Sequence, residues 1–287
     1  LVGQVPLVGG AQPVGQVAPG KTIIMPCLHD EPTARLDIFK PLIEGARGTW
    51  FLTDPEAELA ERLFDLPRRR AVVGAGIEVG DEHDPDAFRA SYGIEGPFVY
   101  YAGRREWGKG WLQLVEAFAS AVLDHGVDLT LVTSGVGEIE APDAVRGHIV
   151  DVGFLSDTDR DNAMAAASAY VQPSAMESFS RTVLEAWAAG TAVIANAESD
   201  VVRWHVERSG AGLLYRGADE LVEALRFVAE QPGAARRLAG PGRRYVEEGF
   251  RWVDVVDRML DTLDRWVPSR QPAAVGAAAA GSSEDRP

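Results

Sequence analysis

Short apolar runs rich in β-branched residues alternate with longer amphipathic stretches through most of the chain. In the second half the strand-like runs are "FVYYAG", "DLTLVTSG", "HIVDVG", "AYVQPS", "TAVIAN" and "AGLLY". Stretches with helical spacing separate them, among them "GWLQLVEAFASAVLDHG" and "SDVVRWHVERSG". Near-continuous apolar strands joined by crossover helices indicate a parallel sheet covered on both faces. We therefore predict a doubly wound, Rossmann-like domain over residues 91–250.

The first half of the chain repeats this alternation over a shorter length. Its predicted strands are "KTIIMPC", "TWFLT" and "RAVVGAG", and its predicted helices are "ARLDIFKPLIEGA" and "DPEAELAERLF". The second of these helices opens with Asp-Pro, which is typical of a helix start. We predict a partial Rossmann-like domain over residues 21–90. The acidic stretch "IEVGDEHDPDAFRASYGIEG" is predicted to be an irregular linker.

The two ends of the chain differ from the middle. Residues 1–20 are rich in Gly, Pro and Val and are predicted to be an irregular or truncated start. Residues 251–267 have a helical pattern, and residues 268–287 lack one and are predicted to be a disordered tail. The predicted fold class is therefore α/β, with two Rossmann-like domains that contain parallel sheets, the first one shortened.

Composition narrows the range of functions. A net charge of −15 argues against non-specific binding to nucleic acid. The single cysteine allows no internal disulfide and favours a reducing compartment. We find no apolar run of the roughly 18 residues that a membrane span needs and no signal peptide, so we expect a cytoplasmic protein. The basic cluster "LPRRR" at 66–70 could contact anionic lipid at the inner face of the membrane or form a solvated turn.

Ligands of open parallel sheets bind outside the carboxyl ends of the strands. The residues that follow the predicted strands are therefore candidates for a binding site. After "FVYYAG" comes "GRREWGKG", in which Gly103 lets the backbone approach a ligand and Arg104 and Lys109 could meet a phosphate group. After "DLTLVT" comes a second glycine-rich turn, which begins at Ser134 and Gly135.

Two glutamates stand eight positions apart in "MESFSRTVLEAWAAG". Glu177 precedes a predicted helix start, and such starts attract anions through their unpaired N–H groups. Glu185 lies among apolar residues, and a buried carboxylate needs hydrogen-bond partners, which sugar hydroxyls could supply. Taken singly, Glu177 could merely favour the helix dipole, and Glu185 could face solvent. Together these features would suit a ligand with a diphosphate, a flat base and a polyhydroxyl part.

This stretch carries a resemblance to a known family. "ESFSRTVLEAWAAGTAVIAN" resembles the Glu, seven residues, Glu signature of glycosyltransferase family 4, the retaining, GT-B type glycosyl transferases of group 1. "YYAGRREWGKGWLQLVEAF" is similar to the family's Gly-Arg, Lys-Gly and helix motif, and "VDVGFLSDTDRDNAMAAASAYVQPS" resembles its base-binding loop and next strand. The resemblance implies a GT-B architecture, with the front part of the first domain missing.

The resemblance also implies roles for individual residues. Arg104 and Lys109 would neutralise the donor diphosphate, Glu177 would lie beside the donor sugar, and Glu185 would bind the ribose hydroxyls. The segment "IIMPCLHDEP" makes His29 the candidate near donor sugar and acceptor, although a histidine there could also only cap a helix. The remaining implied substrate contacts come from Gly103, Ser134, Gly135, Phe154 and Leu155 beside the base, and the backbone of Ser178, Phe179 and Ser180.

The predicted function is that of a retaining, hexosyltransferase-like glycosyltransferase of polysaccharide biosynthesis. It would move a sugar from a nucleotide diphosphate sugar, such as a UDP- or GDP-sugar, to a glycan or lipid-linked cell-envelope acceptor. No Asp-x-Asp motif stands directly at the end of a predicted strand, so we expect a reaction that needs no metal ion. We also expect no cofactor, since the nucleotide sugar is a substrate. The alternatives are a catalytically inactive module that binds a nucleotide or a partner chain, and a sugar-nucleotide epimerase, which shares the two-domain form.

Overall fold

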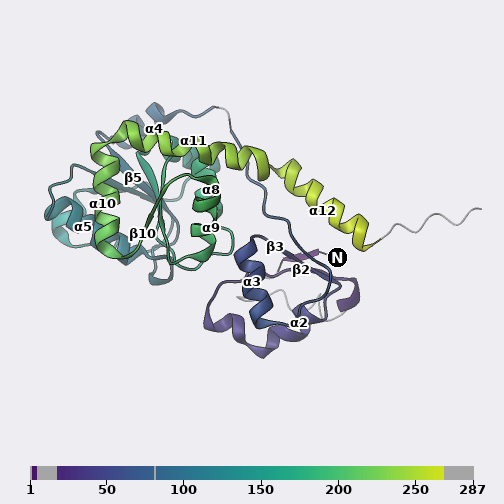
Figure 1. Cartoon of the computed structure of the whole chain (residues 1–287). Coiled ribbons are helices and arrows are strands. Elements are labelled where there is room, and N and C mark those ends of the chain that lie inside the picture. Colours follow the sequence, from purple (N-terminus) through teal and green to yellow (C-terminus); the bar gives the residue numbers. More distant parts are fainter. Residues whose placement is uncertain (1, 5–17, 81, 268–287) are drawn as a thin grey trace, which may run out of the picture.

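The computed structural model describes residues 2–4, 18–80 and 82–267 of the chain. Its strands form two sheets, and every strand pair among these residues is parallel. Figure 1 shows the sheets side by side, with helices packed around the larger one. The predicted α/β fold class with two parallel sheets is confirmed.

The smaller sheet is built from the first 72 residues. Its strands lie in the order β1 (Val2–Gln4), β2 (Ile23–Met25), β3 (Gly48–Phe51) and β4 (Arg70–Val72). Strands β2 and β3 are buried along their whole length, as the apolar runs predicted. Helix α3 (Asp54–Leu63) connects β3 to β4, and Thr53 caps it by accepting a hydrogen bond from Glu56 N at 3.2 Å.

Two predictions for this half are wrong in part. Residues 2–4 form β1, although we expected an irregular start; residues 1 and 5–17 lie outside the described residues, as does the predicted tail at 268–287. The single helix expected over "ARLDIFKPLIEGA" is three short pieces: the 3-10 helices η2 (Pro32–Arg35) and η3 (Asp37–Phe39), and α2 (Lys40–Glu44). Leu36 has extended backbone between the first two, which breaks the helical hydrogen bonding.

The larger sheet has six strands, and its order reverses in the middle. From one edge to the other they are β10 (Leu213–Tyr215), β9 (Val193–Asn196), β8 (Ala169–Gln172), β5 (Phe98–Ala102), β6 (Thr130–Ser134) and β7 (Ile149–Asp151). The chain places β6 and β7 on one side of β5, and β8, β9 and β10 on the other. Such a reversal is the place where doubly wound sheets bind ligands.

Each face of this sheet has its own hydrophobic cluster, because side chains alternate along a strand. One cluster combines Val99, Leu131 and Ile194 with α5 (Trp111–Leu123) and α10 (Gly217–Glu230). The other combines Tyr100, Val132 and Val193 with residues of α7 (Asp157–Ala166), α8 (Arg181–Ala188), α9 (Asp200–Ser209) and α11 (Pro232–Gly249). Both faces are covered, as predicted. Three short helices lie in the connections: the 3-10 helices η1 (Pro19–Lys21) and η4 (Trp107–Lys109), and the α-helix α6 (Asp143–Arg146).

The stretch predicted to be an irregular linker contains helix α4 (Pro85–Tyr92). Asp84 caps it by accepting a hydrogen bond from Ala87 N at 2.9 Å, and Gly93 ends it with a left-handed backbone. Arg89 of this helix donates to Ala166 O at 2.7 Å, which ties it to the larger sheet's unit. The acidic composition of this stretch favoured the interpretation as a linker. The start and end signals of the helix, Asp-Pro and Gly, were both present in the sequence.

Helix α12 (Trp252–Trp266) returns to the smaller sheet, as Figure 1 shows in yellow. Trp50 Nε1 of β3 donates to Thr262 Oγ1 at 2.8 Å, and Trp266 packs so closely on Gly48 that an added Cβ would lie 2.7 Å from its ring. The chain crosses between the two sheets twice, once before α4 and once before α12. These two crossing segments meet where Ile77 N donates to Phe250 O at 2.7 Å. The two sheets are thus held together by α12 and by this paired crossing.

Candidate active site

A cavity of about 910 Å³ lies where the carboxyl ends of the two sheets face each other. This is within the usual size of a small-molecule site. The smaller sheet's side of the lining is Met25, Cys27, Leu52, Gly74 and Ala75; the larger sheet's side includes Tyr101, Ala102, Gly103, Arg104, Lys109, Gln172, Ser174 and the segment 177–182. The strands β5 and β8, between which the order reverses, therefore end at this cavity.

The turn after β5 sends two adjacent arginines in different directions. Arg104 lines the cavity, and 62% of its side chain is exposed beside Glu106, whose carboxylate lies 3.2 Å away. Arg105 is buried and donates to Thr133 Oγ1 at 3.2 Å, to Gly137 O at 2.8 Å and to Asp151. Arg105 thus fixes the turn to β6 and β7, and Arg104 stays exposed on the wall of the cavity.

Lys109 and Glu177 face each other across the reversal of the sheet. Lys109 Nζ lies 2.9 Å from Glu177 Oε1, and Gln172 Nε2 donates to the same oxygen at 3.0 Å. The turn that carries Lys109 approaches β8 closely: a Cβ on Gly110 would lie 2.5 Å from Pro173 O, and its φ is +73°. Glycine is therefore required where the two strand exits meet.

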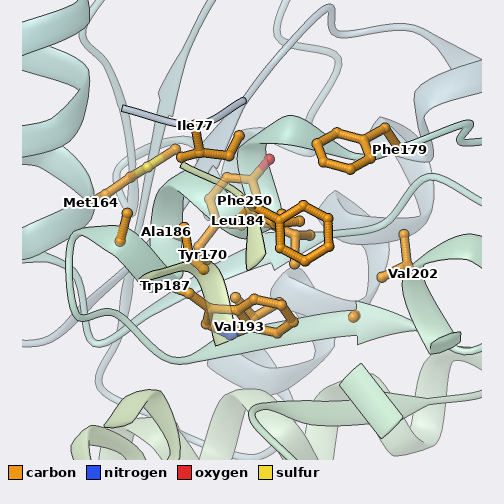
Figure 2. Close-up of a cluster of buried hydrophobic side chains, with 14 of the residues drawn as sticks. Ile77, Met164, Tyr170, Phe179, Leu184, Ala186, Trp187, Val193, Val202 and Phe250 are labelled. Carbon is orange, nitrogen blue, oxygen red and sulfur yellow. The ribbon is translucent and has the colours of Figure 1, made fainter. Parts of the chain in front are cut away.

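The N-terminus of α8 borders the same cavity. Ser178, Phe179 and Ser180 line it just before the first helical residue, Arg181. Phe179 is buried, with its ring 5.7 Å from that of Phe250; Figure 2 shows these two rings on one side of the hydrophobic cluster. This aromatic anchor holds the helix start in place beside Lys109 and Arg104.

Glu185 lies about one turn further along α8, four residues after Arg181. Its side chain is nearly buried, with 10% of it exposed. Its carboxylate oxygen lies 3.2 Å from Arg181 Nη2 and 3.5 Å from Arg160 Nη2. We expected sugar hydroxyls to compensate for its burial, and in this structure two guanidinium groups do so. Arg160 was not singled out in the sequence, because only the fold brings α7 beside α8.

His29 follows β2 and is held near the site by a buried carboxylate. Burial lowers the pKa of His29, with opposing contributions from the nearby charges of Glu177, which raises it, and Lys109, which lowers it. Glu56 of α3 accepts hydrogen bonds from Leu28 N at 2.8 Å and Leu52 N at 2.6 Å. Sequence reasoning missed Glu56; the signal was an acidic residue in the first turn of a helix, at a position that the apolar spacing would bury.

Six predicted site residues are not part of the cavity lining: His29 and Glu185, described above, and Ser134, Gly135, Phe154 and Leu155. Ser134 is buried, and its Oγ shares a hydrogen bond with Tyr100 OH. Gly135 lies so close to Gly103 O that a Cβ would be 2.1 Å from it. Leu155 is buried in the core, whereas Phe154 is 86% exposed at the start of the β7–α7 turn. The roles given to these residues, and to the others, stay predictions.

Two features are absent from the described residues: a membrane-spanning helix and a metal-binding cluster of side chains. None of their helices is both long and apolar enough to cross a membrane. They also contain no group of three or more His, Cys, Asp or Glu side chains placed to hold a metal ion.

Comparison with known proteins gives a family match over the larger unit. Residues 96–248 match the family described as Glycosyl transferases group 1, which is more than half of the chain. A D-inositol 3-phosphate glycosyltransferase of Jonesia denitrificans is 30% identical over 202 residues, 63% of this chain and 46% of that protein. A phosphatidyl-myo-inositol mannosyltransferase of Mycobacterium tuberculosis is 32% identical over 151 residues, 47% of this chain and 39% of that protein. The chain spans less than half the length of these two relatives.

Solved structures match across both sheets. The Anabaena protein HepE in complex with UDP-glucose aligns with a TM-score of 0.71 at 17% identity, over 88% of this chain and 74% of that one. Sucrose-phosphate synthase of Thermosynechococcus elongatus aligns with a TM-score of 0.70 at 21% identity, over 85% of this chain and 67% of that one. At such identities the likeness establishes the fold, and it confirms the predicted GT-B architecture.

Proposed function

The chain belongs to the glycosyl transferases group 1 family, and on this premise we propose that it transfers a sugar from a nucleotide diphosphate sugar to an acceptor. One observation carries the proposal: Arg104, Lys109 and the N-terminal residues of α8 line a single cavity. Cationic side chains and the N–H groups of a helix start both stabilise phosphate charge. They support a donor diphosphate at this end of the larger sheet.

The proposed transfer retains the configuration of the anomeric carbon. The bond from that carbon to the donor phosphate oxygen breaks, and a bond to an acceptor hydroxyl oxygen forms on the same face. The hydroxyl proton passes to the departing diphosphate, so no covalent intermediate on the protein is needed. Arg104 and Lys109 stabilise the charge that develops on the leaving diphosphate. Glu177 orients Lys109 through their ion pair and lies beside the donor sugar.

The other parts of the donor are assigned to residues beyond Arg104 and Lys109. Glu185 is assigned to the ribose hydroxyls on the family resemblance alone; its carboxylate pairs with Arg181 and Arg160 and lies outside the cavity lining. Phe154 packs on the flat base, which its exposure at a strand exit supports. The backbone of Ser178, Phe179 and Ser180 contacts sugar or phosphate. His29 lies within electrostatic reach of Glu177, which supports a place between donor sugar and acceptor.

The acceptor is proposed to be a glycan or a lipid-linked cell-envelope precursor. The inositol-containing names of the two relatives support a polyhydroxylated acceptor. The reaction is proposed to need no metal ion, because two side-chain cations already face the diphosphate position. Equal transfer rates with Mg²⁺ and with excess chelator would support this, and a chelator-sensitive rate restored by Mg²⁺ would contradict it.

The decisive experiment combines donor binding with donor cleavage. Thermal unfolding of the whole chain is measured with UDP, GDP, ADP and the matching nucleotide sugars, in the original protein, Glu185→Ala and the exposed control Glu58→Ala. The donor is identified when one nucleotide and its sugars raise the unfolding temperature of the original protein and of Glu58→Ala but not that of Glu185→Ala. A donor labelled in its sugar is then incubated with the protein and glycan acceptors. Release of labelled sugar to an acceptor supports the transferase, and binding without release supports the inactive module, which the family membership does not favour.

A further inference from the structure

Among the described residues, two that are not glycine have a positive φ: Cys27 at 54° and Ser180 at 61°. Both line the cavity. A left-handed backbone is sterically unfavourable for L-residues, and such strain gathers at ligand sites. The strain at Cys27 has a local support, because Glu56 accepts a hydrogen bond from Leu28 N in the same turn. Ser180 requires a separate explanation.

The helix does not explain why residue 180 is a serine. Ser180 is the N-cap of α8, but its side chain makes no capping hydrogen bond. A serine N-cap normally has extended backbone and accepts a hydrogen bond from the first turn, which is the source of its stabilising effect. The left-handed backbone of Ser180 departs from that geometry, with φ 61° and ψ 61°. Glycine would adopt it without strain.

The core does not explain the serine either. Ser180 is 4% exposed, and its Oγ has no hydrogen-bond partner within the described part of the chain. A buried hydroxyl without a partner lowers the stability of the folded state. Ser180 therefore carries two penalties, one from its backbone and one from its hydroxyl, and it carries both on the wall of the cavity.

We infer that the Ser180 hydroxyl is a ligand-binding group that donates a hydrogen bond to the terminal phosphate of a nucleoside diphosphate. The inference rests on the proposed function for the nature of the ligand. The surroundings fit this acceptor: Arg104 and Lys109 line the same cavity, and α8 starts at the next residue. Hydrogen bonds to ionised acceptors are stronger than those between neutral groups. Ligand binding thus supplies the partner that the folded chain does not.

Two substitutions at position 180 separate binding from folding. Ser180→Ala removes the hydroxyl and keeps the strain, whereas Ser180→Gly removes both. Affinities are measured by calorimetry for the mono- and diphosphate of whichever of uridine, guanosine or adenosine the original protein binds. We expect both variants to bind the diphosphate about tenfold more weakly and the monophosphate unchanged. We expect Ser180→Gly to have a higher Tm than Ser180→Ala, by about 2 °C or more.

A structural role for the hydroxyl would give another pattern. Affinity would then follow stability, and Ser180→Gly would bind the diphosphate as tightly as the original protein, which overturns the inference. Equal losses for mono- and diphosphate also overturn it, because the hydroxyl would then not contact the terminal phosphate. Ser91→Ala, which removes an exposed hydroxyl from α4, is the matched control and should change neither affinity.

Failure of the inference can be told apart from failure of the proposed function. If the original protein binds the diphosphate and Lys109→Ala weakens that binding, the donor site stands. Unchanged affinity in both Ser180 variants then overturns the role of Ser180 alone. If the correctly folded original protein binds none of UDP, GDP and ADP, the proposed function and the inference fall together.

Discussion

Lys109 Nζ lies 2.9 Å from Glu177 Oε1, and this ion pair joins the turn after β5 to the turn after β8. These are the two strands between which the order of the larger sheet reverses. Each partner comes from a different crossover, so the pair exists only because the parallel sheet brings the two strand exits together. It places one cation and one carboxylate side by side on the wall of the cavity.

The first prediction concerns Lys109. Lys109→Ala should lower turnover by about 10² or more, because it removes a charge that stabilises the leaving diphosphate. Initial rates of sugar transfer at saturating donor measure the effect. Lys40→Ala is the control, since Lys40 is a half-exposed lysine of the smaller unit that pairs with Asp37. Full turnover in Lys109→Ala would show that this lysine has no part in the reaction.

The second prediction uses the adjacent pair Arg104 and Arg105. Arg104→Gln should weaken diphosphate binding by about tenfold and leave Tm nearly unchanged, because its side chain is largely exposed. Arg105→Gln should lower Tm by several degrees, because it leaves Asp151 and two other acceptors without their donor. Calorimetry and thermal unfolding of both variants check this. A lower Tm for Arg104→Gln together with weaker binding and an unchanged Tm for Arg105→Gln would contradict the exposure of Arg104 and the burial of Arg105.

The third prediction concerns the pH dependence of stability at Glu56. Burial raises the pKa of Glu56 to about 7 from the ordinary 4.5, against the opposing effect of its backbone hydrogen bonds. Between these pH values the folded protein holds more protons than the unfolded chain, so the free energy of unfolding should fall as pH rises. The contribution of one group is at most about 1.4 kcal/mol per pH unit.

Urea unfolding from pH 5 to 8 measures this dependence. Glu56→Gln should lose the slope, so the stability difference between it and the original protein should shrink or reverse as pH rises through 7. Glu58→Gln, on the exposed face of the same helix, should keep the slope of the original protein. Parallel curves for the original protein and Glu56→Gln would mean that Glu56 is ionised throughout this range.

The fourth prediction concerns the pH dependence of stability at His205, which is opposite in sign to that at Glu56. Complete burial among aromatic rings lowers the pKa of His205 to about 3 from 6.5, and its Nδ1 lies 3.0 Å from Tyr245 OH. Below pH 6.5 the unfolded chain takes up a proton that the folded protein excludes, so stability should be lost as pH falls from 6.5 towards 3. The ring should therefore contribute to acid unfolding.

Denaturation between pH 4 and 7 tests the role of this histidine. His205→Phe removes the titrating group and should flatten the acid side of the stability curve, whatever its effect at neutral pH. His125→Phe is the control, because His125 is exposed and its loss should leave the acid dependence intact. An unchanged acid slope in His205→Phe would show that other groups set the acid limit.

Local patterns predicted the larger sheet well because each of its strands has a run of two or more apolar residues and its long helices are amphipathic. The secondary-structure predictions failed where one capping or breaking residue outweighed the overall composition of a stretch. Asp84 and Gly93 bound a helix inside an acidic stretch, and Leu36 breaks what the spacing suggested was one helix. Both outcomes depend on single capping or breaking residues, which the average over a window does not register.

The candidate site divides in the same way. Arg104, Lys109 and Glu177 could be selected from the sequence, because strand exits of a parallel sheet meet at one edge and residues there share a site. The sequence by itself therefore indicated that the turns after β5 and β8 face the cavity. It did not determine which side chain in a turn faces it: Arg104 and Arg105 are neighbours of the same type, and the acceptors offered by Thr133, Gly137 and Asp151 decide that Arg105 is buried.

Only the tertiary structure brought in the partners of these residues. Glu56 holds the turn before His29 through backbone N–H groups of two different strand exits, and Arg160 reaches Glu185 from the neighbouring helix. The left-handed backbone of Ser180 is likewise visible only in the folded structure. Periodicity reports which face of an element is apolar. Contacts between residues far apart in the chain depend on how those faces pack, and packing is a property of the whole fold.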